Sequence, residues 1–153
     1  MDINQKLRTH LHQAMKENDI TSKRVLRLLM TSIKLAEVAK SSELDDIEVL
    51  GIIQKETKTK QDAIADAKKA ERNDLIAEAE DDIKILEKYL PEQIPQEELH
   101  ALGKELIEEL GATSMKDTGK VIKAFIAKLA GRASNQEASK VIRDILQDKL
   151  SKQ

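Results

Sequence analysis

The chain has 153 residues, of which 35% are charged and 1% aromatic, and its formal net charge is −2. It contains five glycines, two prolines and no cysteine. This composition excludes disulfide scaffolds, thiolate metal sites and cysteine nucleophiles. It also argues against strand-rich folds and base-stacking platforms, both of which depend on aromatic residues. We therefore expect an all-α fold made of one domain or two small ones.

Four helices are predicted in the first 90 residues. The first covers about residues 3–18, and the second covers 21–40 with an apolar arc wide enough for a central helix. Asp45, with glutamate three residues later, forms a capping box that starts a third helix. Asn73 is expected to cap a fourth. The third helix has no apolar residue over 54–62, so this stretch is expected to face solvent or a wet partner surface.

The two prolines, Pro91 and Pro95, predict a break between two domains. Proline has no N–H to donate, and the residue before it avoids the α region, so two prolines this close stop a helix. We predict an N-terminal helical domain over 1–90, a linker over 91–95 and a small C-terminal helical domain over 96–153.

The C-terminal domain is predicted to contain three helices. The first covers 96–110 and ends at Gly111. The second starts at Ser114 and ends at Gly131, and a capping box at Ser134 starts the third.

Few residues suggest catalysis. His10 and His12 lie about 200° apart on a helix and cannot share a metal ion, and His100 is isolated, so all three are interpreted as solvent-facing. The acid pairs at 45–46 and 81–82 are interpreted as helix starts or solvated faces. No glycine-rich phosphate loop and no nucleophile–base spacing stands out. We expect no metal and no cofactor; an intrinsic enzymatic activity stays undecided, with a non-enzymatic role favoured.

Neither a membrane span nor a secretory signal is recognised in the sequence. No apolar run approaches the roughly 20 residues that a membrane span needs. The first residues lack the apolar core of a secretory signal. We therefore expect a cytoplasmic protein with no membrane partner.

Charge is sorted along the chain. Residues 111–143 carry seven basic and two acidic residues, whereas 71–87 and 96–110 are acidic. On a helix, Lys116, Lys120 and Lys123 fall within about 60° of one another. A solvated face is one explanation of this cluster, and contact with a phosphate backbone is the other.

Two further groups of cations form a secondary basic surface. Lys23, Arg27 and Lys34 align on the second helix, although they also fit snorkelling at the edges of its apolar arc. The polar stretch 54–62 supplies the other group: Lys55, Lys58 and Lys60.

Several runs carry a resemblance to a known family. They are Val25-Leu26-Arg27-Leu28-Leu29, Tyr89-Leu90-Pro91-Glu92-Gln93, Met115-Lys116-Asp117, Gly119-Lys120-Val121 and Gly131-Arg132-Ala133. In this order and spacing the chain resembles the YqeY family, also called GatB/YqeY-like proteins. The resemblance covers essentially the whole chain.

The resemblance implies a free-standing relative of the tail domain of the B subunit of tRNA-dependent amidotransferases. That tail is helical, has a larger N-terminal and a smaller C-terminal part, and contacts the tRNA elbow away from the amidation chemistry. The phosphate-contacting residues predicted here are Lys116, Lys120, Lys123, Lys128 and Arg132.

The chain also departs from the family pattern. Ser134-Asn135 replaces a usual Asp-Gly, Thr118 a usual Met and Ala127 a usual Pro. Gly119 is a family position with a second explanation, because a missing Cβ allows two helices to approach closely.

Three functional hypotheses follow. The first is a non-catalytic tRNA-binding accessory module. The second is a component or helper of a carbon–nitrogen ligase that uses glutamine as amido-nitrogen donor, with the amidotransferase or aminoacyl-tRNA machinery as partner. The third is a protein-interaction module that uses the polar helix 54–62. A DNA partner is not expected.

Overall fold

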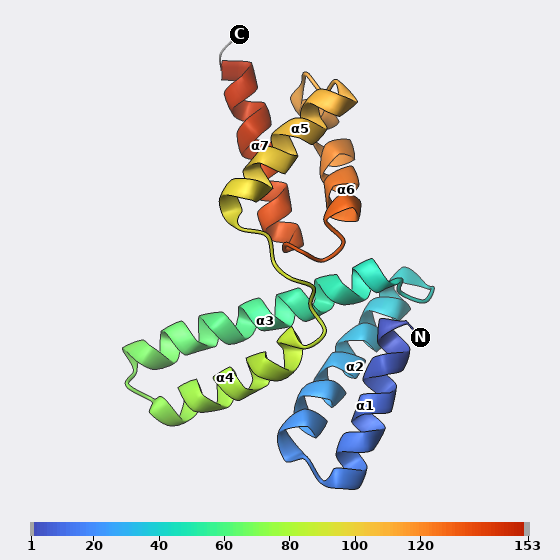
Figure 1. Ribbon diagram of the computed structural model, residues 1–153, viewed down its shortest axis with the longest axis vertical. Helices are drawn as coiled ribbons and strands as arrows, with labels where there is room; N and C mark the ends of the chain where they lie inside the picture. Colours follow the sequence, from blue (N-terminus) through green and yellow to red (C-terminus); the bar gives the residue numbers. More distant parts are fainter. Residues whose placement is uncertain (1, 152–153) are drawn as a thin grey trace. The chain divides into compact units, whose positions relative to one another are not determined.

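The computed structural model describes residues 2–151, and within this range the chain forms seven α-helices, one 3-10 turn and no strand (Figure 1). The all-α prediction is confirmed. The chain divides into unit 1, which ends at Leu90, and unit 2, which begins at Pro91. The elements are α1 (Ile3–Glu17), α2 (Ile20–Lys40), α3 (Asp46–Lys69), α4 (Asn73–Glu87), α5 (Gln96–Leu110), η1 (Met115–Asp117), α6 (Thr118–Leu129) and α7 (Asn135–Ser151). No helix of the described range has both the length and the apolarity to cross a bilayer.

Unit 1 contains two antiparallel helix pairs, α1 with α2 and α3 with α4 (Figure 1). Helix α2 contacts α1, α3 and α4, which is the central position that its wide apolar arc predicts. The shared core contains buried aliphatic side chains from all four helices: Leu7, Val25, Leu26, Leu29, Ile33, Val49, Ile53 and Leu86.

Local capping decides where the helices of unit 1 begin. The capping box at Asp45 is confirmed, because its carboxylate accepts from the backbone N–H of Glu48 at 2.8 Å and Glu48 accepts in return at 3.2 Å. The predicted cap at Asn73 is wrong. Helix α4 starts one residue earlier than that prediction requires, with Arg72 at the N-cap position and no side-chain cap. The guanidinium of Arg72 pairs instead with Asp74.

The turns of unit 1 each pass through one residue in the left-handed region. These residues are Asn18, Ser41 and Glu71, with φ values of 54°, 62° and 56°, and none is glycine. All three are exposed. The backbone N–H groups of Asn18 and Ser41 donate to carbonyls of the last helical turn, which closes the C-termini of α1 and α2.

Unit 2 packs α5, α6 and α7 around a core centred on Phe125, which is fully buried. Helix α5 ends at Gly111 with φ of 66°, as predicted. Gly103 of α5 packs closely against α7, since a Cβ there would lie 3.0 Å from Cγ1 of Val141. At Gly119 a Cβ would meet nothing within 4 Å, so the close-packing explanation of that glycine is wrong.

The segment before α6 differs from the expected helix. The Ser114 hydroxyl accepts from the backbone N–H of Lys116 at 3.2 Å, and this starts the short turn η1. Helix α6 begins only at Thr118. Lys116 therefore lies outside α6, and its helical-wheel alignment with Lys120 does not apply.

Residues 91–95 are non-helical. The side-chain amide of Gln93 donates to the carbonyl of Gly131 at 3.1 Å, and the backbone N–H of Ile94 donates to the carbonyl of Arg132 at 2.9 Å. These bonds hold the entry to α5 against the turn between α6 and α7.

Candidate nucleic-acid interface

The strongest basic surface lies on α6. This helix buries Val121, Phe125 and Leu129 along one face. Lys120 and Lys123 lie on the opposite face, Lys128 lies in the last turn, and all three are exposed. The apolar face therefore decides which way the lysines point, because burying one side of an amphipathic helix turns the other side to solvent.

These lysines have no carboxylate partner among residues 2–151. Every ion pair found in that range lies in unit 1, including those of Arg24, Lys40 and Arg72. Lys116 in η1 is also exposed and without an ion pair. Four ammonium groups near α6 are thus available to an external anion.

Arg132 differs from the other predicted contacts. It is half-buried, and its Nε donates to the carbonyl of Leu129 at 3.1 Å. Its own carbonyl accepts from Ile94. Arg132 thus holds the turn that follows α6, and only the end of its guanidinium is left for an anion.

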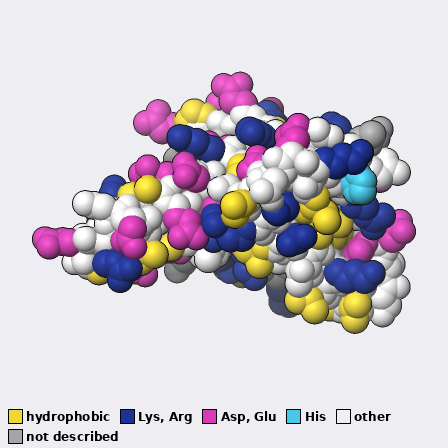
Figure 2. Space-filling model, turned by 90° about the horizontal axis from the view of Figure 1, so that it is seen from below, with side chains coloured by type: hydrophobic (Ala, Val, Ile, Leu, Met, Phe, Trp, Pro, Cys, Tyr) yellow, Lys and Arg dark blue, Asp and Glu magenta, His cyan; other side chains and the backbone are white. Residues whose placement is uncertain are grey.

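The secondary basic surface is only partly open. On α2, Arg27 and Lys34 are exposed, whereas Lys23 is half-buried and donates to Oδ1 of Asn18 at 3.0 Å. Figure 2 shows one face of the molecule, on which Lys and Arg side chains lie among acidic and hydrophobic ones rather than in a continuous basic field.

The expectation that the whole stretch 54–62 faces solvent is wrong. Gln54 and Thr57 are buried, and the Thr57 hydroxyl donates to the carbonyl of Ile53 at 2.9 Å. Gln54 and Thr57 thus occupy the buried face of α3, where apolar residues such as Ile53 are otherwise found. Of the three lysines, Lys55 and Lys58 are exposed, and Lys58 pairs with a carboxylate one turn on.

Lys60 belongs to a buried charge cluster that sequence reasoning missed. Its Nζ lies 3.2 Å from Oδ2 of Asp82, and the guanidinium of Arg24 pairs with the other carboxylate oxygen. Asp82 is buried, so its interpretation as a helix start or solvated face is wrong. One signal was available: Asp82 falls on the apolar stripe of α4 that joins Ala79 to Leu86.

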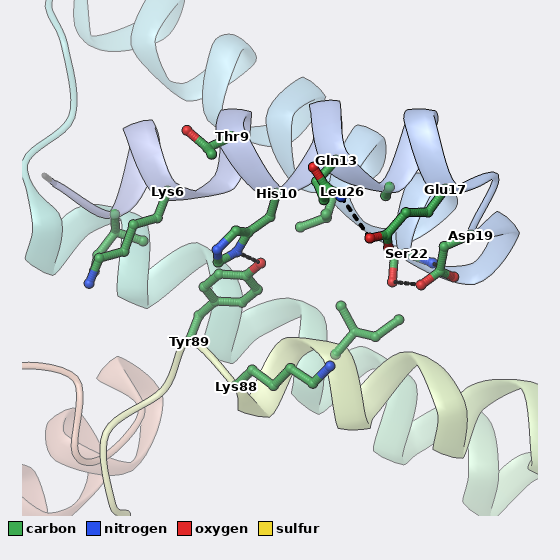
Figure 3. Close-up of a pocket in the computed structure, with 13 residues that line it drawn as sticks. Lys6, Thr9, His10, Gln13, Glu17, Asp19, Ser22, Leu26, Lys88 and Tyr89 are labelled. Atoms are coloured by element: carbon green, nitrogen blue, oxygen red, sulfur yellow. Dashed lines mark hydrogen bonds between the residues drawn. The ribbon is translucent and has the colours of Figure 1, made fainter.

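Unit 1 also has an open groove of about 680 Å³ between α1, the start of α2 and the end of α4 (Figure 3). Within it, Nδ1 of His10 and the hydroxyl of Tyr89 form a hydrogen bond of 2.5 Å. His10 is exposed, as predicted, but its ring is hydrogen-bonded to another side chain of unit 1. This bond links α1 to the segment that directly follows α4. Burial raises the pKa of the Tyr89 phenol above its usual range.

Two further pairs of polar side chains in the groove are hydrogen-bonded to each other. Gln13 donates to Glu17 at 2.6 Å, and the Ser22 hydroxyl donates to Asp19 at 2.8 Å (Figure 3). The backbone and side-chain bonds from Ser22 lower the pKa of Asp19. No group of three or more His, Asp or Glu side chains in the described range could hold a metal ion. The groove thus offers polar contacts but no activated nucleophile.

Comparison with known proteins places the chain in a family. Residues 4–146 match the family model described as Yqey-like protein. A protein of Vanderwaltozyma polyspora, named altered inheritance of mitochondria protein 41, mitochondrial, is 32% identical over 72% of this chain and 64% of its own length. This chain therefore spans less than two thirds of that relative.

A second relative, from Schizosaccharomyces pombe, is described only as an uncharacterized protein. It is 30% identical over 56% of this chain and 70% of its own length. Since the family model covers nearly the whole chain, including both units, the protein belongs to the YqeY family.

Proposed function

We propose that this protein is a non-catalytic tRNA-binding accessory module whose contact surface is the lysine face of α6. This name covers the exposed Lys120, Lys123 and Lys128 of α6 together with Lys116 of η1. The observation that carries the proposal is the contrast in ion pairing within residues 2–151. Every ion pair in this range involves a cation of unit 1, such as Arg24, Lys40 or Lys60. Lys116, Lys120, Lys123 and Lys128 of unit 2 have no carboxylate partner and are all exposed. Unpaired surface lysines suit the phosphate backbone, which they bind by releasing condensed counterions.

The shape of the ligand follows from what the surface lacks. The single phenylalanine, Phe125, is fully buried in unit 2, and the single tyrosine, Tyr89, is bonded to His10 in unit 1. Neither is placed to stack on a base. Recognition through phosphates and overall shape, as in duplex RNA or a folded tRNA elbow, needs no stacking.

In this role the protein works beside another enzyme. The resemblance to amidotransferase tail domains supports a position next to a tRNA-dependent amidotransferase, a carbon–nitrogen ligase that takes its nitrogen from glutamine. The amide-transfer chemistry then belongs to the partner. The polar helix 54–62 was the alternative, as a docking element for another protein. No specific observation favours that role, because one side of the stretch packs inside unit 1.

The test is a titration of fluorescently labelled tRNA with the full chain at two salt concentrations. We expect the association constant to fall as salt rises. In the variant Lys120→Gln, Lys123→Gln, Lys128→Gln, the slope of log affinity against log salt should be smaller by about 2 to 3, as three lost phosphate contacts require. The matched control, Lys16→Gln, Lys68→Gln, Lys69→Gln, removes three exposed lysines of unit 1 that belong to neither basic surface.

Two results would overturn the proposal. One is the absence of binding at micromolar protein in low salt. The other is an equal loss in the unit 1 control, which would mean that affinity reflects total charge and not the lysine face of α6. Release of ammonia from glutamine by the purified protein alone would overturn the non-catalytic assignment.

A further inference from the structure

The outer face of α2 carries large aliphatic side chains that the fold leaves uncovered. Leu28, Leu35 and Val38 are 44%, 66% and 70% exposed. Thr31 lies between them, and its hydroxyl donates to the carbonyl of Arg27 at 3.0 Å, which leaves its methyl group for apolar contact. We call these four residues the α2 seam.

The spacing of the seam is that of a coiled-coil surface. Positions 28, 31, 35 and 38 are separated by three, four and three residues, the a-and-d pattern of two heptads. They cover about 15 Å of helix. The core-facing residues Leu26 and Ile33 occupy f positions, on the opposite side, and are 2% and 1% exposed. Helix α2 therefore has two apolar faces. One packs in the core of unit 1, and the other, the α2 seam, is exposed.

Basic residues flank the seam on one side. Arg27 and Lys34 immediately precede Leu28 and Leu35, which places them at g positions, where coiled coils carry the charges that select a partner. Both are exposed, and neither forms an ion pair within residues 2–151. Other cations of the same helix do: Arg24 pairs with Glu78 and Asp82, and Lys40 pairs with Glu48.

We propose that the α2 seam binds an amphipathic helix of another protein, whose apolar stripe is flanked by glutamate or aspartate. Leucine and valine at heptad spacing provide the apolar contact, and the unpaired Arg27 and Lys34 select for acidic flanks. This inference concerns unit 1 and does not depend on RNA binding by α6.

Two other occupants fit the seam less well. A second copy pairing through α2 in antiparallel fashion would bring Arg27 and Lys34 against the same cations, and a parallel pair would place them opposite uncharged residues. The acidic helices α4 and α5 each expose one large aliphatic residue, Leu75 and Leu110, rather than a stripe. RNA gains little from exposed leucine and valine, because its outer surface is charged.

The test uses two synthetic coiled-coil peptides of about three heptads, with isoleucine and leucine at a and d. One carries glutamate at e and g, and the other carries lysine there. Binding of each labelled peptide to the full chain is measured by fluorescence anisotropy. We expect the acidic peptide to bind at least about tenfold more tightly than the basic one, which corresponds to about 1.4 kcal/mol.

Two variants separate the apolar and the ionic contributions. Leu35→Gln with Val38→Gln should weaken the acidic peptide about tenfold, and Arg27→Glu with Lys34→Glu should reverse the preference between the peptides. The matched controls, Leu75→Gln and Arg8→Glu with Lys55→Glu, alter exposed residues of unit 1 outside the seam and should leave binding unchanged. Circular dichroism confirms that each variant is folded.

Equal affinity for the two peptides, or equal effects in the controls, would overturn the proposal. So would a self-associated chain in sedimentation whose dimer is lost in the Leu35→Gln, Val38→Gln variant, since the seam would then be an interface between copies. Loss of tRNA affinity in the same variant would assign the seam to RNA instead.

Discussion

The Asp82 carboxylate on α4 is 1% exposed and lies 3.2 Å from Nζ of Lys60 on α3. Arg24 on α2 pairs with the other oxygen, so one buried anion joins three helices of unit 1. Both cations reach the cluster from partly exposed positions, which lets their remaining donors stay hydrated. The cluster thus satisfies a buried charge at a smaller desolvation penalty than a fully enclosed ion pair would have.

Asp82→Asn is therefore expected to destabilise unit 1. The amide keeps the size of the side chain but removes the charge that two cations face, at a cost of about 1–3 kcal/mol in the free energy of unfolding. Urea denaturation followed by the fluorescence of Tyr89, the only tyrosine, reports on this unit. The neighbouring exposed residue provides the control, and Asp81→Asn should have little effect. Equal stability of the two variants would contradict the role assigned to Asp82.

The same substitution should have opposite effects at two glycines of unit 2. At Gly103 a new Cβ lies 3.0 Å from Val141 and 3.3 Å from Ile145, so Gly103→Ala overpacks the α5–α7 contact and costs about 1 kcal/mol after the gain in helix propensity. At Gly119 the space is open, so Gly119→Ala should stabilise by up to about 1 kcal/mol. Thermal unfolding followed by circular dichroism measures both, and a shared sign would be inconsistent with the packing described.

Burial of Tyr89 predicts a loss of stability at alkaline pH. The pKa of its phenol is raised in the folded state, and it is about 10 when the chain is unfolded. Between these two values the unfolded state loses its proton first, so the free energy of unfolding falls as pH rises through this window. Below the unfolded pKa the full contribution is present.

Urea denaturation of the wild type and of Tyr89→Phe, measured by circular dichroism from neutral to alkaline pH, isolates this effect. Lysine titration is common to both proteins, so the difference between them reports the tyrosine alone. We expect the difference to shrink above a pH of about 10. A difference that stays constant with pH would show that the phenol titrates alike in both states.

The lysine face of α6 is expected to make no contribution to folding. Lys120 and Lys123 lie one turn apart in the first half of α6, where like charges repel and the helix dipole disfavours cations. Lys120→Gln with Lys123→Gln should leave the thermal midpoint unchanged or slightly higher. A clear decrease would mean that the lysines stabilise the fold and are not free for a ligand.

Much of the fold can be predicted from short sequence signals, each of which spans only a few residues. The capping box at Asp45 and the termination at Gly111 lie where the sequence predicts, since each depends on neighbours within one helical turn. Lys116 was misplaced because a helical wheel assumes continuous helix. The Ser114 cap closes a tight 3-10 turn before α6 begins.

Contacts between distant residues could not be predicted in this way. The Arg24–Asp82 pair joins residues 58 apart, and the His10–Tyr89 bond joins residues 79 apart. No local pattern distinguishes a carboxylate that two remote cations will neutralise from one that faces water. The position of Asp82 within an apolar stripe was the only indication, and it required knowing that α4 buries that stripe.

The left-handed turns at Asn18, Ser41 and Glu71 have a consequence for how the protein can change. A non-glycine residue in this conformation costs roughly 1 kcal/mol, somewhat less for asparagine, and glycine avoids the cost. Glu71→Gly is thus a change that raises stability at a position that belongs neither to α6 nor to the outer face of α2. A stabilising substitution at such a position offsets the loss of stability caused by substitutions on a binding surface. The protein can then remain folded while that surface changes, in evolution or in engineering.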